Sequence, residues 1–194
     1  MRLFLFLALS LSLFACGHRY RFANRQLAAA DTSFVYSLPY PKGKSHLLVQ
    51  GYNSRFSHRG RLGLDFKMKT GSPITAARGG VVVGLEESNT EGGARRSYFR
   101  KANFVTIRHE DGTMASYGHL MHNGVVVNLG DTVQAGQVIA HSGSTGYSAI
   151  PHLHFSVWKP DPVRRKAVPT RFHTRNGIRY LRPGYWYRSI RFTK

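Results

Sequence analysis

Hydrophobic and polar residues alternate over short distances along most of the chain, from His46 to Trp158. Runs rich in Val, Ile, Thr and Tyr are separated by Gly, Asn, Asp and Ser, a pattern typical of short strands joined by tight turns. No window shows a convincing apolar period of 3.6 residues over the length of a helix. We therefore predict a mainly antiparallel β structure, with strands at residues 47–50, 64–67, 74–77, 81–85, 104–109, 113–117, 125–127, 137–140 and 152–158.

The first 16 residues have the features of a bacterial export signal. A 13-residue apolar run at residues 3–15 follows Arg2, which suits a signal-peptide core and is too short to span a bilayer. Cys16, the only Cys of the chain, comes next, and residues 13–17 resemble a bacterial lipobox. We expect residues 1–15 to be a signal peptide and Cys16 to be lipidated, anchoring an exported protein to the outer membrane in the periplasm. The alternative is a plain secretory signal with an incidental Cys.

The rest of the chain divides by composition into a tether, a domain and an extension. Residues 16–45 contain Arg, Ser and Pro with weak periodicity, which predicts a tether leading into a domain at residues 46–159. Inside the domain, residues 87–102 are polar, Gly-containing and basic, as in long functional surface loops. Such a loop would narrow a groove or dock a regulatory partner. Residues 160–194 hold ten Lys or Arg and one acidic residue, and their interleaved aromatic residues predict that this extension packs on the domain.

The charge balance indicates a polyanionic environment. The chain has 28 Lys and Arg against 9 Asp and Glu, a formal net charge of +19, which suits nucleic acid, anionic lipid or an acidic cell-wall polymer. The export signal makes nucleic acid the weakest of the three. A 42% apolar composition argues against a disordered chain, and a single Cys excludes an internal disulfide framework and a Cys-rich zinc site. We expect a monomer.

Two His residues head the last predicted strand of the domain. His152 and His154 are separated by Leu153, and residues two apart in a strand point to the same side. Both imidazoles would then face one wall of a groove, while Leu153 and Phe155 face the core. With ten His in the chain, one such pair is expected by chance about half the time, so the context must decide between a structural pair and a metal site.

The context is an isolated carboxylate and two further His residues. Asp65 lies between two apolar residues, so its side chain is expected to point away from a buried pair. In an acid-poor chain, a cation is a natural partner for this carboxylate. The alternative is an Asp that faces solvent. His58 precedes it by seven residues, with Gly60 and Gly63 between them to let the chain loop back. His119 follows Tyr117-Gly118 at a strand end, where alternation would place the aromatic ring and the imidazole on one face. Two His and one Asp with a fourth position open is the pattern of a catalytic zinc.

These residues belong to a longer series of motifs. The series comprises Ser57-His58, Leu64-Asp65-Phe66, Gly71-Ser72-Pro73-Ile74, residues 76–82, residues 103–113, Tyr117-Gly118-His119-Leu120, residues 130–133, residues 136–140, residues 142–146 and Pro151-His152-Leu153-His154-Phe155. In this order it resembles the lysostaphin-type (LytM-like) zinc endopeptidases, which cut peptidoglycan peptides. The resemblance covers about 108 residues, from Gly51 to Trp158. Each motif alone is weakly specific, but the ordered combination is highly specific.

The resemblance implies a small antiparallel β-sandwich with a narrow groove, the duplicated hybrid motif. It implies that His58, Asp65 and His154 bind Zn²⁺, and that His119 and His152 flank the attacking water and the scissile carbonyl. The first ligand stands seven residues before the Asp here, whereas four is the commonest interval in the family.

The implied activity is zinc-dependent hydrolysis of peptide bonds in peptidoglycan cross-links or stem peptides. Zinc lowers the pKa of bound water to about 7, and either His119 or His152 would act as the general base. Ligating imidazoles must be neutral, so activity is expected to fall on acidification. The alternative on the same fold is a non-catalytic envelope-binding or amidase-activating protein, which the intact set of five polar residues disfavours. Nucleic-acid or lipopolysaccharide binding by the basic extension is a third and weaker hypothesis.

Overall fold

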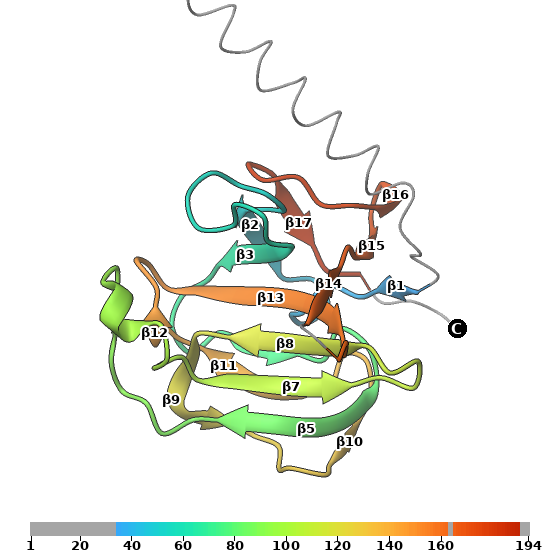
Figure 1. Cartoon of the computed structure of the whole chain (residues 1–194). Coiled ribbons are helices and arrows are strands. Elements are labelled where there is room, and N and C mark those ends of the chain that lie inside the picture. Colours follow the sequence, from blue (N-terminus) through green and yellow to red (C-terminus); the bar gives the residue numbers. More distant parts are fainter. Residues whose placement is uncertain (1–33, 163–164, 191–194) are drawn as a thin grey trace, which may run out of the picture. The chain divides into compact units, whose positions relative to one another are not determined.

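The computed structural model describes residues 34–162 and 165–190 (Figure 1). The predicted signal peptide, Cys16 and the tether as far as residue 33 lie outside the described residues. Among the residues that are described, no helix is long and apolar enough to cross a membrane.

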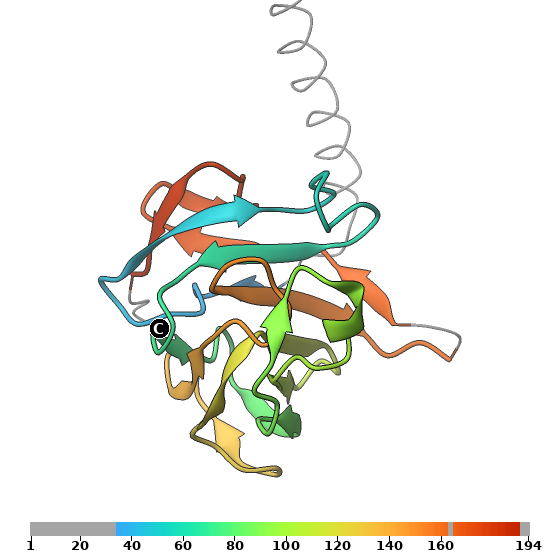
Figure 2. The same ribbon diagram turned by 90° about the vertical axis from the view of Figure 1, so that its left-hand side faces the viewer.

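The main sheet has nine strands, and every pairing within it is antiparallel. The strand order is β10-β5-β7-β8-β13-β3-β2-β17, and β14 adds to β13. The strands are β2 (Ser45–Gln50), β3 (Gly63–Lys67), β5 (Gly80–Glu86), β7 (Phe104–Arg108), β8 (Met114–Gly118), β10 (Thr132–Val133), β13 (His152–Lys159), β14 (Lys166–Val168) and β17 (Trp186–Arg188). Figure 2 shows the same strands turned by 90°.

Smaller sheets complete the fold. One sheet joins β4 (Pro73–Thr75), β11 (Val138–Ser142) and β9 (Leu120–Val125), and it lies behind β5, β7 and β8 in Figure 1. A second joins β1 (Val35–Tyr36), β15 (Arg171–Thr174) and β16 (Gly177–Arg179), and a third pairs β6 (Gly92–Gly93) with β12 (Gly146–Tyr147). The only helical element in the described part is a 3₁₀ turn, η1 (Arg96–Tyr98). The prediction of a mainly antiparallel β fold is confirmed.

Period-two alternation explains how these strands build the core. On β13, Leu153, Phe155 and Val157 are buried, as the alternation predicted. On β3, the fully buried Leu64 and Phe66 flank a residue that points the other way. Burial of large apolar side chains stabilises each strand by about 1.5–3 kcal/mol per residue, and it fixes which side chains are left to face the groove.

Most predicted strands match the observed strands to within two residues, and two predicted boundaries differ by more. The strand predicted at residues 125–127 is observed at Leu120–Val125, because β9 takes its register from β11, with Leu120 opposite Ser142. The predicted tether ends earlier than residue 45, because Tyr36, Leu38 and Tyr40 are buried in the core. These three residues alternate with polar or small neighbours, a period-two signal within the segment predicted as a tether.

The basic extension is built into the same unit. Its strand β14 pairs with β13, β15 pairs with β1, and β17 pairs with β2. Phe172 and Leu181 from this segment are buried, and Phe172 lies 5.8 Å from Phe155, ring centroid to ring centroid. The aromatic residues therefore connect the extension to the core behind the groove.

Candidate metal centre and active site

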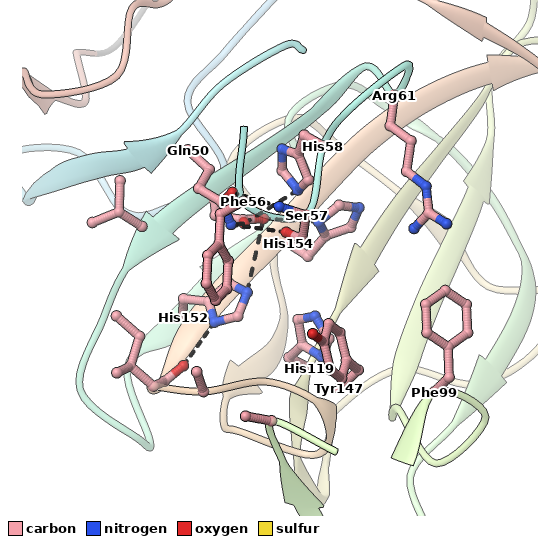
Figure 3. Close-up of a pocket in the computed structure, with 15 residues that line it drawn as sticks. Gln50, Phe56, Ser57, His58, Arg61, Phe99, His119, Tyr147, His152 and His154 are labelled. Carbon is pink, nitrogen blue, oxygen red and sulfur yellow. Dashed lines mark hydrogen bonds and ion pairs between the residues drawn. The ribbon is translucent and has the colours of Figure 1, made fainter. Parts of the chain in front are cut away.

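His58, Asp65 and His154 converge at one point. One potential ligand atom from each lies within 4.8 Å of the other two. Asp65 and His154 stand opposite each other in the pairing of β3 with β13, and His154 Nδ1 lies 2.8 Å from Asp65 Oδ1. His58 Nε2 approaches the other carboxylate oxygen at 3.2 Å (Figure 3). The structure thus brings together the three residues for which the sequence predicted metal binding.

The loop between β2 and β3 positions His58. Its Nδ1 lies 3.1 Å from the carbonyl oxygen of Gly51, and because a carbonyl only accepts, Nδ1 carries the proton and Nε2 is left to face Asp65. The backbone of Arg61 closes a turn onto His58 at 2.9 Å, and Gly60 within that turn has a φ of 68°. This looped path accommodates the interval of seven residues between His58 and Asp65.

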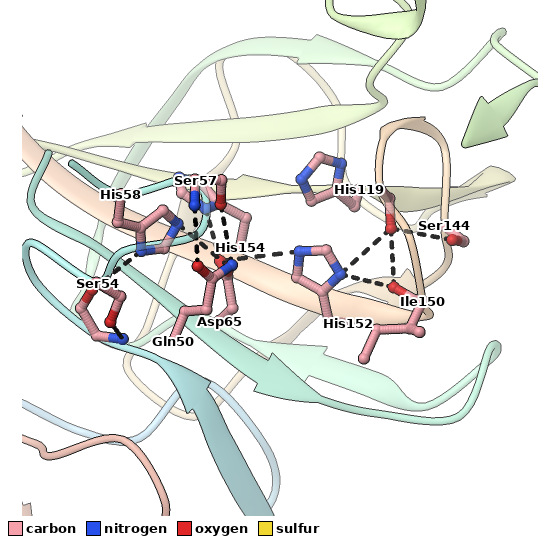
Figure 4. A network of polar contacts seen from close by, with 12 residues as sticks. Gln50, Ser54, Ser57, His58, Asp65, His119, Ser144, Ile150, His152 and His154 are labelled. Atoms are coloured by element: carbon pink, nitrogen blue, oxygen red, sulfur yellow. Dashed lines mark hydrogen bonds and ion pairs between the residues drawn. The ribbon is translucent and has the colours of Figure 1, made fainter. Parts of the chain in front are cut away.

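Asp65 has a hydrogen-bond partner besides the two predicted metal-binding His residues. Gln50 donates from Nε2 to Asp65 Oδ2 at 2.7 Å. The same amide nitrogen donates to Ser57 Oγ at 2.9 Å, and the Ser57 backbone N–H donates back to Gln50 Oε1 at 3.1 Å (Figure 4). Gln50, at the end of β2, was not among the residues singled out in the sequence, and Ser57 was named only as the neighbour of His58 in a motif, without a role of its own. Such outer partners fix the orientation of a metal-binding carboxylate.

The electrostatics of the cluster keep Asp65 ionised. Burial alone would raise the pKa of Asp65, but hydrogen bonds from His154 and His58 outweigh it and hold this pKa far below its usual range. Burial lowers the pKa of His58, and the hydrogen bond and charge of Asp65 raise it further than burial lowers it, so the net shift is upward. A buried carboxylate stabilised in its charged form beside two imidazoles has the chemistry of a cation site.

His119 and His152 form a second pair beside the cluster. Their ring centroids are 4.6 Å apart. His119 Nδ1 lies 2.7 Å from the Thr145 carbonyl oxygen, and His152 Nδ1 lies 2.7 Å from that of Ile150. Both Nδ1 atoms therefore carry protons, and each Nε2 is free to accept one. Burial and the nearby His152 lower the pKa of His119 to about 3, and burial also lowers the pKa of His152, so both rings are neutral near pH 7.

His119 reaches the groove by a route that simple alternation does not give. Tyr117 and His119 were expected on one face, but Tyr117 is fully buried and its hydroxyl accepts from the Ala77 backbone N–H at 2.8 Å. His119 has a φ of 62°, a left-handed conformation uncommon for residues other than Gly. This single residue between β8 and β9 turns the imidazole away from the core.

A groove with apolar walls surrounds the five polar residues. Its lining includes Phe56, Phe99, Tyr147, Ile150 and Arg61 as well as the His and Asp residues. Phe56 and Phe99 keep 75% and 56% of their surface exposed. Phe99 comes from residues 87–102, so the loop predicted there contributes to the wall of the groove. None of these five side chains was a candidate; Phe56 and Phe99 in particular are exposed aromatic residues outside strands, where no periodic signal marks them.

The donor set fits a metal ion. Two imidazole nitrogens and one carboxylate oxygen converge on one point, and the side facing the groove is left open, which is the arrangement of three-ligand sites with an exchangeable fourth position. The Gly51 carbonyl behind His58 and the Gln50 amide behind Asp65 are the kind of second partners that metal-binding side chains require.

Comparisons with known proteins agree with this geometry. The sequence profile of Peptidase family M23 matches residues 59–168, which contain Asp65, His119, His152 and His154 and begin one residue after His58. Glycyl-glycine endopeptidase ALE-1 of Staphylococcus capitis is 38% identical over 118 residues, 60% of this chain and 26% of that protein. Peptidoglycan DD-endopeptidase ShyA of Vibrio cholerae is 35% identical over 95 residues, 49% of this chain and 19% of that protein.

A solved structure shares the fold. A mutant catalytic domain of the prophage-encoded M23 protein EnpA from Enterococcus faecalis superposes with a TM-score of 0.51 at 29% identity, covering 66% of this chain and 92% of that chain. The present chain spans about a quarter or less of the length of ALE-1 and ShyA. Because the family profile covers more than half of the chain and the strands place the motif residues around one groove, the chain belongs to peptidase family M23, the lysostaphin-type peptidases.

Proposed function

We propose that this protein is a zinc-dependent endopeptidase that hydrolyses peptide bonds in peptidoglycan cross-links or stem peptides. The observation that carries the proposal is the position of two neutral imidazoles, His119 and His152, beside the cluster of His58, Asp65 and His154 in one groove. The names of ALE-1 and ShyA, an endopeptidase and a peptidoglycan endopeptidase, support the substrate class.

His58, Asp65 and His154 would hold the metal. A zinc ion bound there would supply a Lewis acid that polarises a carbonyl and lowers the pKa of water. Within the protein, Asp65 offsets part of the cation's charge, and the Gly51 carbonyl fixes His58 in the tautomer that presents Nε2. The choice of zinc over other divalent cations follows from the nitrogen-rich donor set, because zinc favours imidazole with carboxylate at four-coordinate sites.

His119 and His152 would handle protons and developing charge. Each presents an unprotonated Nε2 toward the groove because its Nδ1–H is bound to a backbone carbonyl. An imidazole in this state takes a proton from an attacking water and, once protonated, stabilises a tetrahedral oxyanion or donates to the leaving amine. The two carbonyls hold both rings in the productive tautomer without a second carboxylate.

The proposed location is the bacterial cell envelope. The apolar run at residues 3–15 followed by Cys16 supports export and lipid anchoring, and peptidoglycan is found only outside the cytoplasmic membrane. A formal charge of +19 suits a protein that works among anionic wall polymers and lipids.

The deciding experiment is digestion of purified cross-linked muropeptides, with products identified by mass. The unmutated protein should release defined fragments, while His152→Ala should release almost none although it binds as much zinc. Equal products from both proteins, or none from zinc-loaded unmutated protein, would contradict the proposal; the second result would favour a non-catalytic envelope protein on the same fold.

A further inference from the structure

The loop that positions His58 also places a guanidinium in the groove. Arg61 lines the pocket, and its backbone is fixed on both sides, with its N–H donating to the His58 carbonyl at 2.9 Å and its carbonyl accepting from the Asn53 N–H at 3.1 Å. Its Cζ lies over the ring of Phe99, 5.4 Å from the ring centroid. Figure 3 shows the side chain directed toward Phe99 at the end of the groove away from Gln50. The two loops that flank the groove meet at this pair.

This guanidinium has no carboxylate partner within the part of the chain that the structure describes. Asp65 pairs with imidazoles, Asp111 with Arg78 and Glu91 with Lys101, so none of these acids pairs with Arg61. Asp65, the one carboxylate among the described residues lining the groove, accepts from Gln50 as well as from the His residues. Arg61 is therefore a cation within the binding groove whose hydrogen-bonding edge is left for a ligand.

The contact with Phe99 prepares Arg61 for an anion. A guanidinium over an aromatic ring uses its face for the cation–π contact, and its N–H donors remain available along the edge. That edge matches a carboxylate, which can accept two parallel hydrogen bonds. The ring also restricts the long side chain, so less conformational entropy is lost when a ligand binds.

The surroundings reinforce the preference for negative charge. The two flanking loops also carry Arg55 and Arg59 on one side and Arg95, Arg96 and Arg100 on the other. The acids of residues 87–102 are already engaged: Glu91 pairs with Lys101, and Glu87 accepts from the Val125 N–H at 3.0 Å. Positive charge on both loops raises the local concentration of negatively charged substrates.

We propose that Arg61, positioned by Phe99, forms a carboxylate-binding subsite and selects peptides that carry a free carboxylate close to the scissile bond. The subsite rests on the proposed function, since it serves a substrate peptide lying in the same groove. Converting such a carboxylate to a carboxamide removes the charge and one acceptor oxygen, so the amidated peptide loses the paired interaction.

The test compares native cross-linked muropeptides with the same material after carbodiimide amidation of its free carboxylates. The measurement is kcat/KM for release of the mass-defined fragments. The unmutated protein should prefer the native material by roughly ten- to hundredfold, the range of a hydrogen-bonded charge contact. Arg61→Gln should lose most of this preference, measured as the ratio of the two kcat/KM values for one protein. Arg55→Gln, which removes the same charge from the same loop outside the groove lining, should keep the preference.

Phe99→Leu should reduce the preference part way, because the guanidinium keeps its charge but loses the ring it packs on. An unchanged preference in this variant would remove Phe99 from the subsite. Zinc content and Tm of every variant should equal those of the unmutated protein. Equal cleavage of native and amidated material by the unmutated protein, or an intact preference in Arg61→Gln, would overturn the subsite alone. Cleavage of neither material would overturn the proposed endopeptidase function and the subsite with it.

Discussion

Gly63 leaves the space that the imidazole of His154 occupies: a Cβ atom on Gly63 would lie 2.5 Å from His154 Cε1. The same atom would lie 3.0 Å from Cε1 of His58. Both contacts are shorter than van der Waals distances, so a side chain here must displace the rings on either side of Asp65. The sequence predicted that Gly63 is a flexible residue of the loop, whereas in the structure Gly63, at the start of β3, leaves room for two imidazoles.

We therefore expect Gly63→Ala to weaken zinc binding by at least tenfold, because ligand geometry is lost when the imidazoles move. Zinc affinity measured by chelator competition tests this. Gly84→Ala is the matched control, since a Cβ at Gly84 would lie 3.7 Å from its nearest neighbours on Phe104 and Thr106, an ordinary contact. Equal zinc affinity in the two variants would refute the steric role.

Zinc affinity should fall as the pH falls from 8 to 6. The hydrogen bond and charge of Asp65 raise the pKa of His58 above its usual value against the opposing effect of burial, so in the metal-free protein this imidazole holds a proton to higher pH. Zinc must displace that proton, and log Kd should rise by up to one unit per pH unit below this pKa.

Chelator competition at several pH values measures this slope. His119→Asn should leave it unchanged, because burial and the nearby His152 lower the pKa of His119 to about 3 and the ring does not titrate in this window. A zinc affinity independent of pH between 6 and 8 would show that His58 is not a ligand.

His119→Asn should lower kcat/KM for muropeptide cleavage by about 10²–10⁴-fold, the range for loss of a general acid–base group, and leave zinc content unchanged. Asn is chosen because it tolerates the left-handed backbone at this position, where φ is 62°. His122→Asn, an exposed His on β9, should retain full activity. Residual activity in His119→Asn within a few fold of the unmutated protein would assign the proton transfer to His152 alone.

Leu38→Ala should destabilise the domain by about 2–5 kcal/mol, the cost of truncating a fully packed Leu, because only 2% of the Leu38 surface is exposed. Leu129→Ala, at a residue that is 63% exposed, should change the free energy of unfolding by less than about 0.5 kcal/mol. Urea unfolding of both variants measures the difference. Equal stability would mean that residues 34–40 behave as a tether, as the composition suggested.

Local patterns predicted most strands of the main sheet, because each strand carries its own alternation of apolar and polar residues. The pattern at His152–Val157 specified which side chains face the core, and the structure agrees. The order of the strands could not be predicted in this way, because no local sequence pattern indicates that β13 lies between β8 and β3. That pairing is what places His154 opposite Asp65, and the meeting of these two side chains was inferred from a family resemblance.

One physical reason explains why several residues of the groove were not predicted from the sequence. Gln50, Arg61 and Phe99 act through contacts with segments distant in the sequence, and each looks like an ordinary surface residue in its own neighbourhood. The left-handed backbone of His119 is equally invisible, because tertiary contacts, among them the bond to the Thr145 carbonyl, hold it there. Tyr36, Leu38 and Tyr40 did carry a local period-two pattern, which the Pro residues around them obscured.

In the parallel pairing of β1 with β15, Tyr36 lies opposite Phe172. This pairing joins a strand from the beginning of the domain to a strand from near its end. A growing polypeptide that has been synthesised only as far as β13 lacks β15, the strand with which β1 pairs. Non-local closure of this kind slows folding. Synthesis of β15 therefore completes the pairing of β1, whereas every residue that lines the groove, from Val49 to His154, is made before it.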